Sequence, residues 1–224
     1  MVRAVIFDVD GTLVDTNDLH TASWVEAFRR FGHEVPYDAV RRQMGKGGDQ
    51  LMPAVLPPDA VERHGKEIVE YRGDLFMREY LPRARAFPGV PALLRRVRAA
   101  GQRVVLASSS SAAEVERYKE IADIAGLIDA ETTKDDAEHS KPAPDIFRAA
   151  LERIAPIGPG DAVVVGDSPF DAEAAAKVGL RTVGLLCGGF PEDELRGAGF
   201  VALYRDPADL LANYERSPLA PGPA

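Results

Sequence analysis

Two aspartates separated by one residue carry the clearest chemical signal in the chain. Asp8 and Asp10 come directly after an apolar run at residues 4–7 and are followed by Gly11 and Thr12. Two carboxylates at this spacing can converge on one ligand, and the Gly-Thr turn lets backbone N–H groups point toward it. In phosphoryl transfer one carboxylate can act as the nucleophile while the other protonates the leaving oxygen. The pattern therefore favours a functional site over an ordinary solvated turn.

Short apolar or β-branched runs indicate the strands that would position these carboxylates. The runs are residues 4–7, 104–107, 163–165 and 182–186. Helical patterns lie between them at residues 90–97, 147–154 and 170–178. Strands that alternate with helices of this length predict an α/β fold with a doubly wound parallel sheet. In such a sheet the ligand site lies at the carboxyl ends of the strands.

Residues 16–82 interrupt this alternation, because they contain helical patterns but no convincing strand. We interpret them as an inserted helical cap domain and assign residues 1–15 and 83–216 to the core domain. Residues 82–88 are expected to form the second strand of a two-segment hinge that returns to the core. Residues 217–224 are rich in proline and are predicted to be a flexible tail.

The acidic motif at Asp8 resembles the first motif of the haloacid dehalogenase superfamily, and the other motifs of that family follow in order. Residues 104–108 are similar to the strand that ends in Ser or Thr, here Ser108. Lys141 before a proline resembles the basic motif, and residues 166–171, with Asp167 and Asp171, resemble the second acidic motif. The resemblance covers nearly the whole chain. It implies a Rossmann-like core with a helical cap, in the branch of phosphoglycolate phosphatases and β-phosphoglucomutase-like proteins.

The resemblance also implies catalytic roles and a metal ion. Asp8 would attack phosphorus and form an aspartyl phosphate, and Asp10 would protonate the departing alkoxide and then accept a proton from water. Asp10 must therefore start protonated, and we expect nearby carboxylates and partial burial to raise its pKa. Mg²⁺ would bind the Asp8 carboxylate, the Asp10 backbone carbonyl and Asp167. Asp171 would support these ligands without binding the metal itself.

The remaining residues of the motifs would bind the phosphoryl group. Ser108 and the amide of Ser109 are expected to hold phosphoryl oxygens, with help from Thr12. Lys141 would balance the negative charge on both the nucleophile and the phosphoryl group. The favoured function is a magnesium-dependent phosphatase that acts on a small phosphomonoester such as phosphoglycolate or a sugar phosphate.

A phosphomutase is the main alternative, because Thr16, His20 and Trp24 match the start of the cap in the β-phosphoglucomutase group. However, the cap loop at residues 45–48 contains Lys46 but no arginine to grip a second phosphate. Gly166 also stands where that group has an acidic residue. The sequence assigns no definite role to Lys46 or His20. Dehalogenases and phosphonate-cleaving relatives are disfavoured, since they lack a carboxylate at the position of Asp10.

A non-enzymatic alternative is a receiver-like signalling module, which also surrounds a phosphorylated aspartate with acidic residues, a Ser or Thr and a lysine. Such a module needs a long-lived acyl phosphate. It has no use for an acid two residues after the phosphorylated aspartate, or for a helical insert that covers it. Asp10 and the insert therefore favour the enzyme.

Composition limits the partners. The chain has 35 acidic and 27 basic residues, and its net charge of −8 disfavours nucleic acid and anionic membranes as partners. Cys187 is the single cysteine, which is typical of a reducing compartment, and the apolar run at residues 4–7 is too short for a signal peptide. We expect a cytoplasmic enzyme with a small phosphorylated substrate. The sequence does not decide between a monomer and a homodimer.

Overall fold

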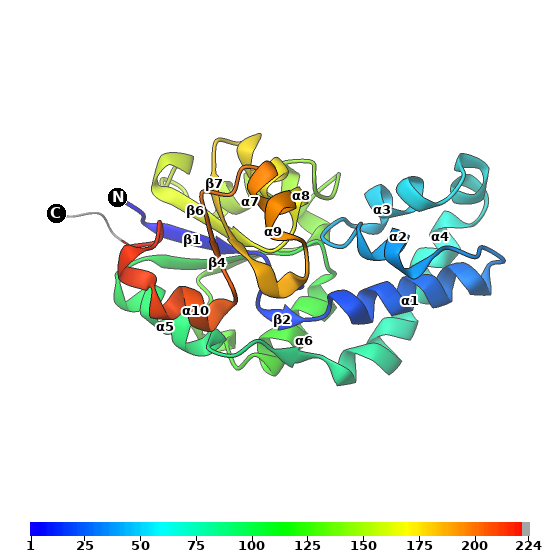
Figure 1. The fold of residues 1–224 in the computed structure, drawn as a ribbon, viewed down its shortest axis with the longest axis horizontal. Helices are drawn as coiled ribbons and strands as arrows, with labels where there is room; N and C mark the ends of the chain where they lie inside the picture. Colours follow the sequence, from blue (N-terminus) through cyan, green and yellow to red (C-terminus); the bar gives the residue numbers. More distant parts are fainter. Residues whose placement is uncertain (221–224) are drawn as a thin grey trace.

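The computed structural model describes residues 1–220, which form a six-stranded parallel sheet with helices on both faces and a helical cap at one end (Figure 1). The strand order is β5-β4-β1-β6-β7-β8. The strands are β1 (Ala4–Phe7), β4 (Arg103–Ala107), β5 (Ala130–Thr132), β6 (Ala162–Gly166), β7 (Arg181–Leu185) and β8 (Ala202–Tyr204). The predicted fold class is confirmed.

The central strands are continuous apolar runs because helices cover both faces of the sheet. In the register of the sheet, Val5 of β1 lies between Val104 of β4 and Val163 of β6, and all three are fully buried. One face packs against α5 (Val90–Ala99), α6 (Ala112–Ile121) and α10 (Pro207–Ala212). The other face packs against α7 (Asp145–Arg153) and α8 (Pro169–Ala176). Strand alternation thus supplies two separate hydrophobic clusters.

The cap consists of four helices with a hydrophobic core of their own. These are α1 (Asn17–Arg30), α2 (Tyr37–Arg41), α3 (Gly48–Val55) and α4 (Pro58–Leu75), which continues into a π-helical turn, Phe76–Tyr80. Trp24, Phe28, Leu51 and Ile68 are buried in this second core. Cap and sheet can therefore pack as distinct units.

Two short antiparallel strands join the cap to the core. They are β2 (Val14–Asp15) and β3 (Arg85–Ala86). The expected two-segment hinge is thus present, while the domain boundaries at residues 15/16 and 82/83 stay a prediction. The elements outside the main layers are α9 (Glu192–Gly197) and the 3₁₀ turns Leu81–Arg83, Ala125–Leu127, Lys134–Asp136, Pro159–Asp161, Leu186–Gly188 and Tyr214–Arg216.

The carboxyl-terminal segment differs from its prediction as a flexible tail over residues 217–224. Ser217 and Leu219 are buried, and Leu219 O accepts a 2.6 Å hydrogen bond from Gln102 Nε2. The prediction is therefore wrong for residues 217–220, because a buried leucine anchors the chain against the core. Residues 221–224 of the predicted tail lie outside the described residues. Within residues 1–220, no helix has the length and apolar character needed to cross a membrane.

Candidate active site

Asp8 and Lys141 form a buried ion pair at the carboxyl end of β1. The Lys141 Nζ atom lies 2.6 Å from Asp8 Oδ1 and 2.7 Å from Asp171 Oδ1, and the lysine has no exposed surface. Burial alone would lower the pKa of Lys141, but the two carboxylates raise it above its ordinary value. The lysine therefore stays charged. It lies beside the residue that the sequence predicts to be the nucleophile.

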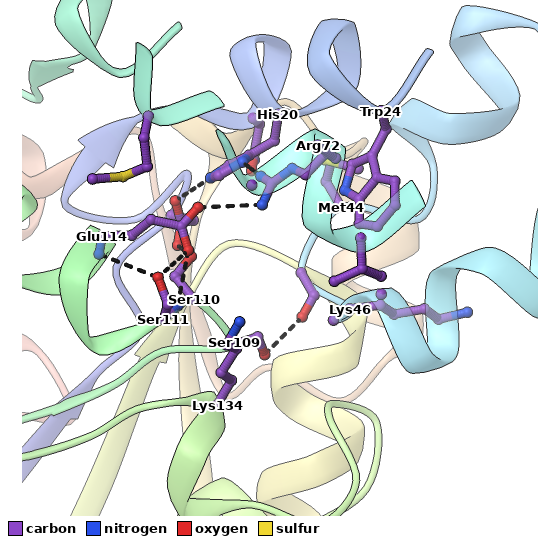
Figure 2. A pocket seen from close by; sticks show the side chains of 18 of the residues that line it. His20, Trp24, Met44, Lys46, Arg72, Ser109, Ser110, Ser111, Glu114 and Lys134 are labelled. Atoms are coloured by element: carbon purple, nitrogen blue, oxygen red, sulfur yellow. Dashed lines mark hydrogen bonds and ion pairs between the residues drawn. The ribbon is translucent and has the colours of Figure 1, made fainter. Parts of the chain in front are cut away.

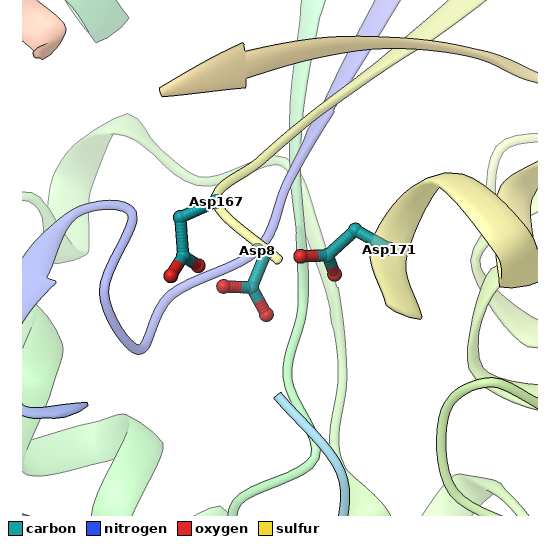
Figure 3. Close-up of side chains that lie close together, drawn as sticks. All are labelled: Asp8, Asp167 and Asp171. Carbon is teal, nitrogen blue, oxygen red and sulfur yellow. The ribbon is translucent and has the colours of Figure 1, made fainter. Parts of the chain in front are cut away.

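Three aspartate carboxylates lie close together beside this ion pair, as Figure 3 shows for the aspartates. Oxygens of Asp8, Asp167 and Asp171 lie within 4.8 Å of one another. Burial raises the pKa of Asp8 to about 7, against the lowering effect of Lys141, and burial and repulsion from Asp8 also raise the pKa of Asp167. Both shifts arise mainly from burial of the carboxylates, and repulsion among them adds to it. A divalent cation would offset their negative charge, and an all-oxygen donor set suits Mg²⁺.

Asp167 and Asp171 differ in how their oxygens are engaged. Asp171 Oδ2 accepts hydrogen bonds from the backbone N–H and hydroxyl of Ser168, and its Oδ1 lies beside Lys141. Asp167 is held by neutral donors, since Asn17 Nδ2 lies 2.8 Å from its Oδ2 and Thr12 Oγ1 lies 2.9 Å from its Oδ1. The Asp167 carboxylate is thus oriented without a cationic partner.

Close backbone packing also confines the Asp167 carboxylate. A Cβ atom at Gly188 would lie 1.8 Å from Asp167 Oδ2, and one at Gly11, where φ is +77°, would lie 2.4 Å from the same oxygen. Side chains at either position would collide with the carboxylate. The two glycines therefore let the backbone close around one edge of the acidic cluster.

The Asp10 carboxylate faces four donors within residues 1–220. Thr16 Oγ1 and His20 Nε2 each lie 2.7 Å from Oδ1. On the other oxygen, Oδ2 accepts from Ser110 Oγ at 2.8 Å and from Ser108 Oγ at 3.3 Å. Every lone-pair region of this carboxylate therefore faces a donor from the cap or from the loop after β4.

This environment corrects the expected pKa of Asp10. Burial alone would raise the pKa, but the adjacent His20 ring, through its electrostatic interaction and its hydrogen bond, and the hydroxyls of Thr16 and Ser110 lower it below its ordinary value. The prediction that nearby carboxylates and partial burial raise this pKa is wrong, because His20 and the hydroxyls outweigh burial. The side chain instead turns toward hydrogen-bond donors. In this conformation Asp10 is a stabilised carboxylate.

The serine-rich loop after β4 connects the sheet to the cap. Ser108 is buried, and its Oγ accepts from the backbone N–H of Ser110 at 3.0 Å. Ser109 Oγ donates to Gly45 O in the cap loop at 3.4 Å. Ser111 caps α6 by accepting from the backbone N–H of Glu114. Ser110 was not predicted as a site residue, although its position within a run of four serines was a usable signal.

Arg72 and Glu114 also belong to the site, and the sequence analysis identified neither. Arg72 Nη1 donates to Glu114 Oε1 at 3.2 Å, and Arg72 Nη2 contacts His20 Nδ1. The His20 ring stacks on Phe76 at a centroid distance of 4.0 Å. Arg72 lies in the charged sequence of α4, where no spacing distinguishes it from its exposed neighbours. Its role in the site is visible only from its contacts with Glu114 and His20 in the folded structure.

A cavity of about 310 Å³ lies between the serine loop and the cap (Figure 2). Its volume suits a small molecule. Lys46, whose role was open, donates to Gln43 Oε1 at 2.7 Å and lies 4.4 Å from the Phe170 ring centroid. The residues that line the cavity include Asp8, Asp10, His20, Trp24, Met44, Lys46, Arg72, Met77, Ser109, Ser110, Glu114 and Lys134. The predicted nucleophile and acid thus face a common space with cap residues.

Comparison with known proteins identifies relatives of this chain. The model of the haloacid dehalogenase-like hydrolase family matches residues 2–179. A phosphorylated carbohydrates phosphatase of Thermotoga maritima is 32% identical over 216 residues, which cover 94% of this chain and 97% of that protein. A phosphoglycolate phosphatase of Nitrosospira multiformis is 31% identical over 183 residues, or 80% of each chain. The crystal structure of a hydrolase from Pseudomonas syringae has a TM-score of 0.83 at 27% identity, covering 96% of this chain and 98% of that one.

Proposed function

The chain belongs to the haloacid dehalogenase-like hydrolase family and is an enzyme, and we propose that it is a magnesium-dependent phosphatase that hydrolyses a small phosphomonoester. The observation that carries this proposal is the Asp8 carboxylate, which lies beside the buried Lys141 and faces the cavity. Membership of a family of hydrolases also decides against the receiver-like signalling module.

Asp8 is proposed to attack phosphorus and to become an aspartyl phosphate. Its Oδ1 is paired with Lys141, while Thr12 Oγ1 lies 2.9 Å from Oδ2. Lys141 offsets negative charge on the nucleophile and on the phosphoryl group that approaches it. Ser108, the amide of Ser109 and Thr12 are proposed to bind phosphoryl oxygens.

Mg²⁺ would be held by Asp8, Asp167 and the backbone carbonyl of Asp10, with Asp171 anchoring Lys141. When bound, the cation would neutralise charge on the phosphoryl oxygens. The raised pKa values of Asp8 and Asp167 support this assignment, because burial and mutual repulsion disfavour their ionised forms and a bound cation would offset both effects.

Asp10 is proposed to be the general acid and then the general base. Its four donors favour the ionised form, so the acid step requires some of these contacts to loosen. The Ser108 and Ser110 hydroxyls can be drawn away by a phosphoryl group, which competes for the same donors. Substrate binding would thereby raise the proton affinity of Asp10 just where the proton is needed.

The substrate class is proposed to be a phosphorylated sugar or a short phosphorylated acid. The names of the Thermotoga maritima and Nitrosospira multiformis relatives support this range, and the cavity of about 310 Å³ has room for it.

The test is phosphate release from a panel of phosphomonoesters by purified protein with Mg²⁺, with glucose 1-phosphate isomers included. We expect phosphate release with no isomerised sugar phosphate. Isomerisation without net phosphate release would show a mutase instead. The matched control is Asp8→Asn, which keeps the shape of the side chain but removes the nucleophilic charge. We expect it to lose turnover, whereas retention of a tenth of the wild-type rate would mean that another residue attacks.

A further inference from the structure

Glu114 is a buried carboxylate that joins the core to the cap. It lies in the first turn of α6, directly after the serine loop, and 5% of its side chain is exposed. Its Oε2 accepts from the backbone N–H of Ser111 at 2.8 Å and from the Ser111 hydroxyl at 2.7 Å. Its Oε1 accepts from Arg72 of cap helix α4 at 3.2 Å. The Glu114 carboxylate therefore hydrogen-bonds both to Ser111 at the end of the serine loop and to Arg72 in the cap.

Arg72 contacts His20 as well as Glu114. Its guanidinium lies over the rings of Phe76 and Trp24, at 4.7 and 5.3 Å from their centroids. Its Nη2 contacts His20 Nδ1, and Figure 2 shows Arg72 between Trp24 and His20. A guanidinium has donors but no acceptor, so His20 Nδ1 must be the accepting nitrogen. The ring hydrogen then lies on Nε2, which is the nitrogen 2.7 Å from Asp10 Oδ1. Arg72 thus selects the tautomer that donates to Asp10.

The guanidinium depends on Glu114 for its charge balance. Only 13% of the Arg72 side chain is exposed. Within residues 1–220, its one ion pair is with Glu114. A buried cation that loses its partner pays a large desolvation cost and is expected to move. Movement of Arg72 would release His20 Nδ1. The tautomer of the His20 ring therefore depends on Glu114, whose hydrogen bonds within residues 1–220 go to Arg72 and Ser111 and not to His20 or Asp10.

We propose that Glu114 is a positioning residue: it holds Arg72 against His20, so that the docked cap presents the His20 Nε2–H group to Asp10. This inference rests on the proposed acid role of Asp10. It adds that His20 keeps Asp10 Oδ1 oriented, while the two serines release Oδ2 for the proton, only as long as the Glu114–Arg72 pair joins core and cap. Loss of the pair should therefore impair protonation of the leaving group more than binding of the substrate.

The main test is Glu114→Gln, which removes the charge but keeps an acceptor at the N3 position of the α6 capping box. The matched control is Glu116→Gln on the same helix, because Glu116 is exposed and pairs with Lys119 at 2.7 Å. Both variants are compared with the wild type on an alkyl phosphate and on p-nitrophenyl phosphate. The alkoxide needs a proton to leave, whereas the nitrophenolate leaves unaided.

We expect Glu114→Gln to lower kcat for the alkyl phosphate by about 10-fold or more, with a clearly smaller loss for p-nitrophenyl phosphate and little change in KM. Glu116→Gln should behave like the wild type. If Glu114→Gln does not fold, Arg72→Lys serves instead, because an ammonium can reach one of the two partners but cannot bridge both; the same contrast between substrates is expected. Equal losses for the two substrates would overturn the proposal.

A second readout does not depend on activity. The ¹⁵N chemical shifts of the His20 ring at one fixed pH report its tautomer, and His20→Gln identifies the signals. We expect an Nε2–H tautomer in the wild type and in Glu116→Gln, and a mixture in Glu114→Gln. An unchanged tautomer in Glu114→Gln would overturn the inference even if the phosphatase activity is confirmed. If the wild type releases no phosphate from the substrate panel, the proposed function fails, and the ring signals still decide whether Glu114 positions His20.

Discussion

His20 Nε2 lies 2.7 Å from Asp10 Oδ1, so a helix of the cap supplies a donor to the carboxylate that is proposed to be the acid of the core. Thr16, at the junction between β2 and α1, supplies a second donor. The proposed proton-transfer group therefore responds to the position of the cap.

Asp10→Asn tests this role most directly. The amide can neither give nor accept the proton, so kcat for an alkyl phosphate should fall on the order of 10²-fold or more. For p-nitrophenyl phosphate, phosphorylation of Asp8 should be less impaired, and hydrolysis of the aspartyl phosphate should become limiting. Rapid-quench kinetics should then show a burst of nitrophenol about equal to the enzyme concentration. Equal losses for both substrates without a burst would leave Asp10 with a structural role only.

The metal requirement can be tested with two cations. Activity should disappear when a chelator is added and return with Mg²⁺. Ca²⁺ should bind, because it also prefers oxygen ligands, but it should support little turnover since its larger and looser shell disturbs the alignment of Asp8. Phosphate release and calorimetric titration measure the two properties separately. Full activity after exhaustive removal of metal would contradict the assignment.

The pKa of Asp8 predicts how the stability of the metal-free protein depends on pH. Burial raises this pKa from its ordinary value of 3.8 to about 7, so the folded state binds the proton more tightly than the unfolded state does. The resulting stabilisation is complete below about pH 4 and is lost as the pH rises through about 7. In chelator, the urea midpoint should therefore be lower at pH 8 than at pH 5.5.

Two controls sharpen this measurement. Mg²⁺ should restore the midpoint at pH 8, because the cation replaces the proton at the acidic cluster. In Asp8→Asn the midpoint should depend less on pH, since the titrating group is gone. A midpoint that rises from pH 5.5 to pH 8 in chelator would contradict the predicted sign.

Lys141→Met tests the charge balance of the buried cluster. The change leaves Asp8 and Asp171 without their cation, and removal of one partner of a buried ion pair typically costs about 3–5 kcal/mol. Urea unfolding in chelator at pH 8 should show a loss of this size. Lys177→Met is the matched control, because Lys177 is exposed and, within residues 1–220, donates only to Pro142 O. It should change stability by about 0.5 kcal/mol or less. Similar losses in the two variants would argue against a charge effect.

The sequence predicted the parts of the fold that depend on local pattern. Strands β1, β4, β6 and β7 were found because their buried apolar runs are long enough to stand out. Strands β5 and β8 are not predicted, because each is only three residues long and forms an edge of the sheet. For example, Glu131 of β5 is only partly buried and pairs with Lys119. Such short, partly polar segments resemble loops in the sequence.

The candidate site divides in the same way. Asp8 and Asp167 lie close together because they follow the neighbouring strands β1 and β6, whereas Lys141 reaches Asp8 from the loop before α7. Arg72 and Glu114 could not be predicted, because their contact joins a cap helix to a core helix 42 residues away. The pKa of Asp10 was predicted in the wrong direction because a sequence does not show which way a side chain points.

The β2–β3 hinge has a consequence for chimeric enzymes. Two strands of two residues each, with Asp15 opposite Arg85, connect the cap to the core, which makes this hinge an obvious splice site for exchanging one cap for another. A graft made there would also remove Thr16 and His20, and with them the two donors on Asp10 Oδ1. A foreign cap would therefore alter the chemistry of the recipient as well as its choice of substrate. Grafts that begin after His20 and keep Arg72 would retain the donors on Asp10, so that the effect of the new cap on substrate choice could be seen alone.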